Sequence, residues 1–270
     1  MTPIWCVLPH RNNVGLTLNA LADLLDQTVP TRVLLIGQGV STETREALER
    51  EAALQPLRVA NWFYDPPLTS LSAVWNTGLQ YCWTTGADRA LVVNNDVRLP
   101  RHLVATLSRA MDAVPLDFVS AVGRPPADWD PARLPPTDFT QRGGPDFSCF
   151  LIRARLHQGD PFDEQFQPAF CEDVDYHRRL LLTGRGPQIA SIDLPYLHFG
   201  SQTLQGLPDE ERRRLEAQIT QGSRAYYAQK WGGPVNAETY WRPFDPESAS
   251  GDGRATTPAL QAEAADAALL

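Results

Sequence analysis

Apolar and polar positions follow two alternating periods along the chain. Short apolar runs of strand length stand at positions 4–8, 32–36, 57–62, 89–93 and 118–122. Between these runs apolar residues recur at helical spacing, as at positions 14, 18, 21, 24 and 25. This spacing predicts helices at 14–25, 42–53, 70–84 and 103–113. A repeated strand–helix pattern predicts an α/β protein with a mostly parallel sheet covered by helices on both faces.

Local signals fix several ends of these elements. Ser41 or Thr42 can cap the second helix, because a hydroxyl accepts from the first unpaired backbone N–H groups. Gly86 ends the third helix, since glycine tolerates the left-handed backbone found there. The run at 89–93 is almost continuously apolar, which is typical of a central parallel strand.

After position 122 the pattern breaks. Residues 124–145 are rich in proline and lack periodicity, which predicts a long irregular loop of the kind that often carries function. Strands are expected at 147–153 and 188–192, and helices from 173 to 183 and from 209 to about 230. Residues 245–270 are small, polar and acidic, and we expect them to be a disordered tail.

Composition places the chain among globular proteins. It has 270 residues, of which 43% are hydrophobic and 21% charged. The formal net charge of −8 argues against a sequence-independent nucleic-acid binder, which needs a basic face. The tail carries half of that charge, so the globular part is only mildly acidic.

Cysteine spacing and apolar run length bear on location. Four cysteines without a C-x-x-C pair predict buried unpaired thiols in a reducing compartment. No apolar run has the length of a membrane span, and the first residues lack the layout of a signal peptide. We therefore expect a soluble cytoplasmic protein, and peripheral association with a membrane stays open.

Three polar features follow buried segments. Asn94, Asn95 and Asp96 come directly after the strand at 89–93, where open α/β sheets bind ligands. An Asx turn that closes the strand is the alternative interpretation. Asp96 could hold a divalent cation, and His198, which follows a later strand, would complete a mixed oxygen and nitrogen site that suits Mn²⁺. A structural histidine is the simpler alternative for His198.

The third feature is the acidic start of the helix near 173. Glu172, Asp173 and Asp175 suit a helix N-terminus by charge alone. At about 100° per residue, Asp173 and Asp175 point about 200° apart, so one is expected to do chemistry and the other to be a structural partner. Asp175 and Arg179 are spaced to form an ion pair.

Common nucleotide motifs are weak or missing. Gly37-Gln38-Gly39 follows a strand, but position 42, where a dinucleotide fingerprint has its third glycine, is Thr42. A phosphate-binding loop needs a lysine before a helix, and the only lysine of the chain is Lys230. The two glycines are therefore interpreted as a turn.

The order of the three features resembles the family 2 glycosyltransferases of the GT-A fold, especially their rhamnosyltransferase-like members. N-N-D at 94–96 stands where those enzymes carry DxD, and E-D-x-D and H-x-x-S follow in their order. Other stretches resemble the first strand and nucleotide loop, the QT…VDNGS stretch, the RNxG helix, the strand ending in Arg, GFDE and the C-terminal helix end: residues 7–12, 26–40, 75–78, 147–153, 161–164 and 226–233. The resemblance covers roughly residues 4–233.

The resemblance implies one GT-A domain at 1–244, with a nucleotide-sugar half at about 1–122 and an acceptor half at about 123–244, before the tail at 245–270. It implies an inverting hexosyltransferase that moves a sugar from a nucleotide diphosphate sugar to a glycan or other acceptor hydroxyl. The nucleotide-sugar contacts it implies are Pro9, His10, Arg11, Gly37, Gln38, Asn76, Asn94, Asn95 and Asp96. Mn²⁺ or Mg²⁺ would be held by Asp96 and His198, Asp173 would be the general base, and the acceptor would contact Glu172, Asp175, Trp129 and Gly144.

Two departures from the family pattern fall on the nucleotide side. Gly37 stands where the aspartate of VDNGS contacts the nucleobase, and Trp75 replaces the arginine of RNxG. A donor other than a UDP-sugar is therefore compatible with the sequence. Two alternatives stay open: a non-catalytic nucleotide-sugar or glycan-binding relative, and a sugar nucleotidyltransferase. The latter would want a basic glycine-rich loop after the first strand, where this chain has one arginine, Arg11, and one glycine, Gly15.

Overall fold

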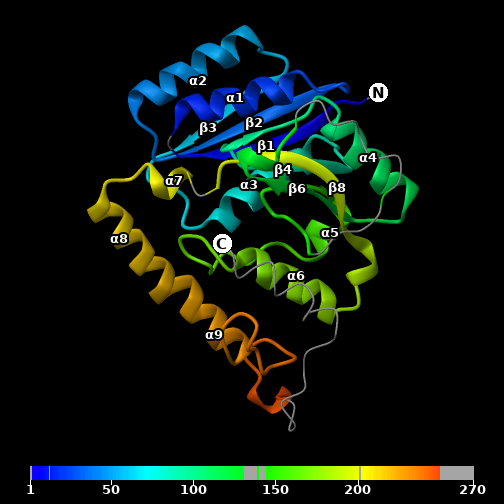
Figure 1. Ribbon diagram of the computed structural model, residues 1–270, viewed down its shortest axis with the longest axis vertical. Helices are drawn as coiled ribbons and strands as arrows, with labels where there is room; N and C mark the ends of the chain where they lie inside the picture. The colour runs from blue at the N-terminus through cyan, green and yellow to red at the C-terminus, as the bar shows by residue number, and fades with distance from the viewer. Residues whose placement is uncertain (1, 12, 131–138, 140–143, 201, 250–270) are drawn as a thin grey trace. The chain divides into compact units, whose positions relative to one another are not determined.

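The computed structural model describes residues 2–11, 13–130, 139, 144–200 and 202–249 (Figure 1). The chain divides into two compact units. Unit 1 comprises Met1–Leu68, Ala73–Pro161 and Pro187–Pro208, and unit 2 comprises Thr69–Ser72, Phe162–Gly186 and Asp209–Leu270. Most of the expected tail at 245–270 lies outside the described residues, and Pro246–Ser248 forms a short 3-10 turn.

Unit 1 is built on a sheet of eight strands in the order β3-β2-β1-β4-β7-β6-β8-β5. The strands are β1 Ile4–His10, β2 Thr31–Gln38, β3 Val59–Tyr64, β4 Arg89–Val93, β5 Val97–Arg98, β6 Phe118–Arg124, β7 Cys149–Arg153 and β8 Ile189–His198. β7 runs antiparallel between β4 and β6, and β5 runs antiparallel to β8. The predicted α/β fold with a mostly parallel sheet is confirmed, with these two strands reversed.

The helices follow the predicted spacing closely. They are α1 Val14–Leu25, α2 Thr42–Leu54, α3 Leu71–Thr84, α4 Leu103–Ala113, α5 Ala154–Gly159, α6 Glu172–Leu182, α7 Gln202–Gln205, α8 Asp209–Ile219 and α9 Ala225–Trp231. Ser41 caps α2 as predicted, because its Oγ accepts the Thr44 N–H at 3.2 Å. The helix predicted from 209 to about 230 is confirmed as α8 and α9, which a π-helical turn, Thr220–Arg224, joins without a break in the helical backbone.

Helices cover both faces of the sheet in unit 1 (Figure 1). α1, α2 and α4 bury one apolar face, with Leu21, Leu48 and Leu107 in a core that includes Leu8 and Leu35 of the strands. α3 packs on the other face. A Cβ at its Gly78 would lie 2.4 Å from a methyl of Val7, so only glycine lets this helix approach β1 so closely.

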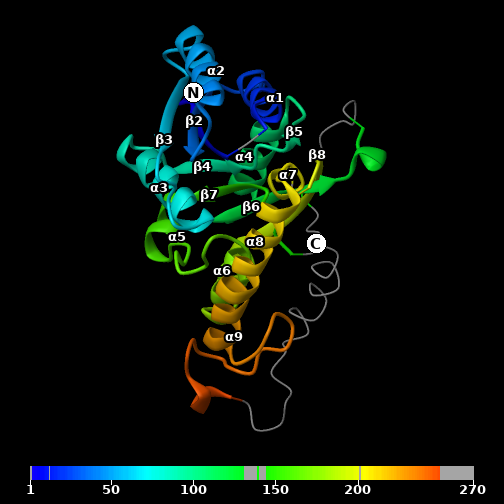
Figure 2. The ribbon, with the colours of Figure 1, turned by 90° about the vertical axis from the view of Figure 1, so that its left-hand side faces the viewer.

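Unit 2 has a smaller core around α6 and α9. Phe166, Tyr227 and Trp231 are almost fully buried there, and Val174 of α6 packs against them. α8, the π-turn and α9 form one nearly continuous rod beside α6 (Figure 2). Cys6, Cys82 and Cys149 of unit 1 are buried and unpaired as expected, whereas Cys171 of unit 2 is only half-buried.

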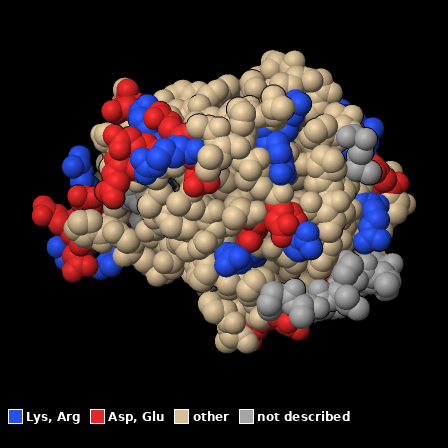
Figure 3. All heavy atoms as spheres, turned by 90° about the horizontal axis from the view of Figure 1, so that it is seen from above, with Lys and Arg blue, Asp and Glu red and all other residues tan. Residues whose placement is uncertain are grey.

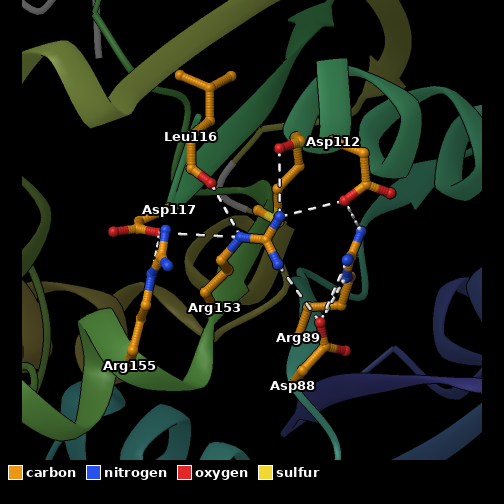
Figure 4. Close-up of polar contacts among 8 residues, drawn as sticks. Asp88, Arg89, Asp112, Leu116, Asp117, Arg153 and Arg155 are labelled. Carbon is orange, nitrogen blue, oxygen red and sulfur yellow. Dashed lines mark hydrogen bonds and ion pairs between the residues drawn. The ribbon is translucent and has the colours of Figure 1, made fainter. Parts of the chain in front are cut away.

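An ionic cluster closes the edge of the sheet where β4 begins and β7 ends (Figure 4). The Arg153 guanidinium donates to the carbonyls of Met111 and Leu116 at 3.2 and 3.1 Å. It also pairs with Asp88 and Asp112 at 3.4 and 3.1 Å. One side chain therefore ties the end of α4 to the starts of β4 and β6.

Replacing Arg153 by Met is expected to lower the free energy of unfolding by about 2 kcal/mol, because two backbone carbonyls and two carboxylates lose a charged donor. For a protein of this size the melting temperature should fall by about 4–8 °C. Thermal and urea unfolding measure both quantities. The matched control is Arg101→Met, whose exposed pair with Asp26 should be worth less than about 1 kcal/mol. Equal losses in the two variants would contradict the assignment.

Candidate active site

Asp96 and His198 meet at the edge of the unit 1 sheet where β4 and β8 end. Asp96 is the third residue after β4, and His198 is the last residue of β8. The Asp96 Oδ1 lies 3.4 Å from the His198 Nε2, and the Asp96 residue is only 6% exposed. The sequence places these two residues far apart, and the antiparallel pairing of β5 with β8 brings them together, with Val97 opposite His198.

The two side chains favour each other's charged form. Burial opposes charge on both groups, yet the hydrogen bond and attraction to His198 lower the pKa of Asp96 below its usual value. The same contact with Asp96 raises the pKa of His198 against the effect of its burial. Asp96 is therefore held as a carboxylate, and a cation at this point would replace the proton of His198, since only the neutral imidazole is a ligand for Mn²⁺.

Asp96 is held in place by the backbone around α7. The N–H of Gln202 donates to the Asp96 Oδ2 at 3.2 Å, and the N–H of Phe199 donates to the Asp96 carbonyl at 2.9 Å. Asn13 in turn donates from its Nδ2 to the Gln202 carbonyl at 3.0 Å. Asn13 has a φ of 62°, a left-handed backbone that is unusual outside glycine. Sequence reasoning missed Asn13, and no local signal marks it.

The two asparagines before Asp96 have different surroundings. Asn95 is buried and donates from its Nδ2 to the Thr17 Oγ1 of α1 at 3.0 Å. Asn94 is half-buried, and its N–H pairs with the Ser148 carbonyl at 2.9 Å. Asn95 thus fixes α1 to the end of β4, while the side chain of Asn94 is the more accessible of the two.

His10, Gly37 and Phe63 form one row across the ends of three neighbouring strands, since His10 pairs with Gly37 and Gly37 with Phe63. A Cβ at Gly37 would lie 2.6 Å from the Phe63 ring and 2.9 Å from the His10 ring, so both rings close over the glycine. His10 is 4% exposed, and neither of its ring nitrogens has a hydrogen-bond partner in the described part of the chain. Of its predicted neighbours, Pro9 is buried and Arg11 exposed.

Two further predicted donor contacts are engaged within unit 1. The Gln38 Oε1 accepts the Leu68 N–H at 2.8 Å. The Asn76 Oδ1 lies 2.9 Å from the His157 Nε2, and the Trp83 Nε1 donates to the His157 Nδ1 at 3.0 Å. An indole nitrogen only donates, so Nε2 must carry the histidine proton and donate to Asn76. This chain of bonds sets the orientation of the Asn76 amide.

Burial of His157 predicts acid sensitivity. It lowers the pKa of His157 from 6.5 to about 4. Between these values the unfolded chain binds a proton that the folded chain does not, so this contribution is complete above pH 6.5 and lost as pH falls toward 4. Between pH 7 and pH 4.5 the free energy of unfolding, measured with urea, should therefore fall by about 2–3 kcal/mol less in His157→Gln than in wild type. Equal decreases in the two proteins would contradict this prediction. The stability of the variant should still depend on pH, because His10 and His177 also have pKa values near 4.

Asp146 is a second carboxylate near His198 that sequence reasoning missed. Its Oδ2 accepts the Gly123 N–H at 2.8 Å and the Tyr196 hydroxyl at 2.9 Å. Its charge adds to the rise in the pKa of His198. Asp146 follows a proline-rich segment in the sequence, and nothing in the sequence indicates that its side chain lies at the end of β6.

The predicted acceptor residues Trp129 and Gly144 belong to the segment 124–145. Both are half-buried, and the Trp129 Nε1 has no hydrogen-bond partner among the described residues. Residues 131–138 and 140–143 lie outside the described part of the chain. The structure therefore places the two residues but not the loop expected between them.

In unit 2 the acidic motif begins on unusual backbone. Phe170 and Cys171 are both left-handed, with φ values of 76° and 69°. Each such non-glycine residue costs about 1–3 kcal/mol and persists only where the surroundings hold it. Glu172 is 5% exposed, its Oε2 has no hydrogen-bond partner among the residues that the structure describes, and burial raises its pKa well above the usual value. Asp173 is half-buried, and its Oδ1 accepts the Val174 N–H at 2.8 Å.

Asp175 faces the opposite way and is fully buried. Its Oδ2 pairs with the Arg179 Nε at 2.9 Å, which confirms the predicted ion pair. Its Oδ1 accepts from the Trp231 Nε1 at 2.9 Å and contacts the Lys230 Nζ at 2.8 Å. Asp175 is therefore buried among structural partners, whereas Asp173 is only half-buried.

A divalent cation fits the donor set at Asp96 and His198. Within the described residues no group of three or more His, Cys, Asp or Glu side chains is arranged to hold a metal ion. The pair supplies one carboxylate and one imidazole, and Mg²⁺ or Mn²⁺ sites of this kind are completed by substrate phosphates and water. The residues therefore fit a metal that arrives with a phosphorylated ligand.

The surface gives less guidance. On the face drawn in Figure 3 the acidic and basic side chains are intermingled, and no continuous basic surface is seen there. In the part of the chain that the structure describes, none of the helices combines the length and the apolar character needed to cross a membrane.

No protein-family model and no curated protein sequence matches the chain. Solved structures do. A mannosyltransferase from Pyrobaculum calidifontis, in complex with GDP-Man and Mn²⁺, superposes with a TM-score of 0.57 at 17% identity, over 98% of this chain and 79% of that one. Residues 1–349 of TarS from S. aureus superpose with a TM-score of 0.56 at 12% identity, over 81% and 71% of the two chains.

GalNAc-T7, solved with UDP, GalNAc and Mn²⁺, is similar as well. Its TM-score is 0.59 at 10% identity, over 73% of this chain and 43% of that one. These proteins are glycosyltransferases of GT-A type, so the chain has the GT-A fold expected from its motifs. At such identities the likeness concerns the fold.

Proposed function

We propose that this chain is an inverting, metal-dependent glycosyltransferase of the family 2 type, which transfers a sugar from a nucleotide diphosphate sugar to an acceptor hydroxyl. The observation that carries the proposal is the Asp96–His198 pair at the carboxyl edge of a GT-A sheet. Ligands of open α/β sheets bind at this edge. The similar structures solved with GDP-Man or UDP and with Mn²⁺ support the same class of donor and cation.

Asp96 and His198 would hold Mn²⁺ or Mg²⁺ on the diphosphate. When bound, the cation supplies Lewis-acid stabilisation of the charge that develops on the leaving diphosphate. The Gln202 N–H holds the Asp96 Oδ2 toward α7, and the other oxygen, Oδ1, lies on the His198 side, where Asp96 and His198 together would hold the cation. Asn94 is the accessible amide for the ribose or phosphate.

Asp173 would act as the general base. It accepts the proton of the acceptor hydroxyl as that oxygen forms its bond to the anomeric carbon and the bond to the diphosphate breaks. Because attack and departure are on opposite sides, the configuration inverts. Glu172, whose Oε2 is buried without a partner, would donate to an acceptor or sugar oxygen in its protonated form.

His10 would contact the nucleobase at the end of β1. A buried imidazole with two unpaired nitrogens is costly unless a ligand or water pairs with it. Gly37 leaves no side chain beside it, so the aspartate that the family uses for the base is replaced here by a neutral ring with a pKa near 4.

A cytoplasmic location and the choice between Mn²⁺ and Mg²⁺ stay predictions from the sequence.

The test is titration calorimetry of the purified chain with UDP-, GDP- and dTDP-sugars in the presence of Mn²⁺, followed by assays of donor turnover. Saturable binding of one donor with slow hydrolysis would support the transferase. Binding without turnover, even with a panel of glycan acceptors, would favour a non-catalytic relative, and release of pyrophosphate from a sugar phosphate and a nucleoside triphosphate would show a nucleotidyltransferase.

A further inference from the structure

The only lysine of the chain is buried in unit 2 between two carboxylates. Lys230 is 4% exposed, and its Nζ lies 2.6 Å from the Asp163 Oδ2 and 2.8 Å from the Asp175 Oδ1. The Phe166 ring lies 5.4 Å from the same nitrogen. A chain that uses arginine for every other cation keeps a lysine here. The ammonium is a compact point charge with three donors, so this one nitrogen can contact both carboxylates.

Both carboxylates also accept hydrogen bonds from other side chains, which hold them in place. The Asp163 Oδ2 also accepts the Tyr226 hydroxyl at 2.9 Å, and Asp175 is held by Arg179 and the Trp231 indole as described above. Lys230 of α9 thus fixes the first turn of α6 at a point two residues after Asp173. It fixes the preceding segment at Asp163 by the same nitrogen.

A second contact holds the backbone on the other side of Asp173. The Ser223 Oγ, in the π-turn, lies 3.0 Å from the Gln167 carbonyl and 2.6 Å from the Ala169 carbonyl. The π-turn presses close, since a Cβ at Gly222 would lie 2.5 Å from the Gln167 oxygen. π-Turns inside helices are frequent at functional sites.

The two left-handed residues, Phe170 and Cys171, stand between these contacts. Strained backbone persists where its surroundings over-determine it, and Ser223 and Lys230 provide that constraint at both ends of the turn. We propose that Ser223 and Lys230, called the clamp, are positioning residues that hold Asp173 in the orientation required of a base. The inference rests on the proposed function for its effect on catalysis, but the holding of the turn stands apart from it.

The test compares Lys230→Met and Ser223→Ala with wild type. Misplacement of a catalytic group by about 1 Å can cost about 100-fold, so kcat is expected to fall by about 10- to 100-fold. The KM for the donor and the affinity for it should stay within about twofold, because the donor residues belong to unit 1. Amide exchange at residues 170–175 should become at least about tenfold faster in both variants, with the remainder of unit 2 unchanged.

Two further variants keep the test decisive if Lys230→Met folds poorly. Lys230→Met with Asp163→Asn removes one half-buried negative charge together with the positive one and should recover stability but not kcat. Arg242→Met removes an exposed cation of unit 2 that pairs with Asp245, and it is the matched control expected to behave as wild type.

A folded Lys230→Met variant with normal kcat, or with unchanged exchange at 170–175, would overturn the clamp. A fall in kcat that merely follows the folded fraction would also overturn it. If wild type itself transfers no sugar from any donor, the proposed function fails, and the exchange measurement still decides whether the clamp holds the turn.

Discussion

Asp173→Asn is expected to lower the rate of sugar transfer by about 100- to 10,000-fold, the usual contribution of a general base. An amide keeps the size of the side chain and its bond to the Val174 N–H, but it cannot take the proton from the acceptor hydroxyl. Donor affinity should change by less than about twofold, because the nucleotide and metal residues lie in unit 1. Steady-state kinetics and calorimetry with the same donor measure the two effects.

The control for this variant is Asp209→Asn in α8. Asp209 is also an acid at a helix start in unit 2, but its side chain is 73% exposed and pairs with Arg212 in the same turn. Its loss should leave transfer unchanged. Retained turnover in Asp173→Asn would remove Asp173 as the base, and Glu172→Gln would then be the variant to examine.

Removal of the divalent cation with EDTA is expected to lower transfer by about 100- to 1,000-fold, since Lewis-acid stabilisation of a leaving phosphate is worth several kcal/mol. Added Mn²⁺ should restore the rate. Asp96→Asn should produce a loss of similar size that Mn²⁺ does not restore, because an amide is a weaker ligand than a carboxylate. The measurement is kcat/KM against Mn²⁺ concentration for both proteins.

The sharper readout is binding of the donor with and without the cation. Wild type should bind the donor more tightly in Mn²⁺ than in EDTA, whereas Asp96→Asn should bind it equally in both. Asp26→Asn, an exposed acid paired with Arg101, is the control that should match wild type. Full activity in EDTA would show that the Asp96–His198 pair has a structural role.

Most of the fold could be predicted from the sequence, because the local spacing of apolar residues indicates its helices and strands. Val14–Leu25 and Leu103–Ala113 begin and end where their apolar spacing does. The reversal of β7 could not be predicted in this way, since a strand between two others reads the same in either direction. β5 has only two residues, Val97 and Arg98, and is too short to leave any pattern.

The candidate site was predictable to the extent that one helix or one strand end defines it. The helical angle between Asp173 and Asp175 predicted that their side chains point in different directions, and Asp175 is the buried one. The partner that buries it, Lys230, comes from α9 and could not be deduced from spacing. Asn13 and Asp146 were missed for the same reason, because each owes its place to a contact made far along the chain.

The reversed β7 makes the segment 124–145 interchangeable. Because β7 runs against β6, the segment leaves and re-enters the sheet at the same edge, and the Gly123–Asp146 hydrogen bond of 2.8 Å ties its two ends together. Each doubling in the length of a connection adds only about 0.6 kcal/mol to the cost of closing it. Descendants of this chain could therefore lengthen, shorten or exchange the segment, and so acquire new acceptors, without disturbing the strands that carry Asp96 and His198.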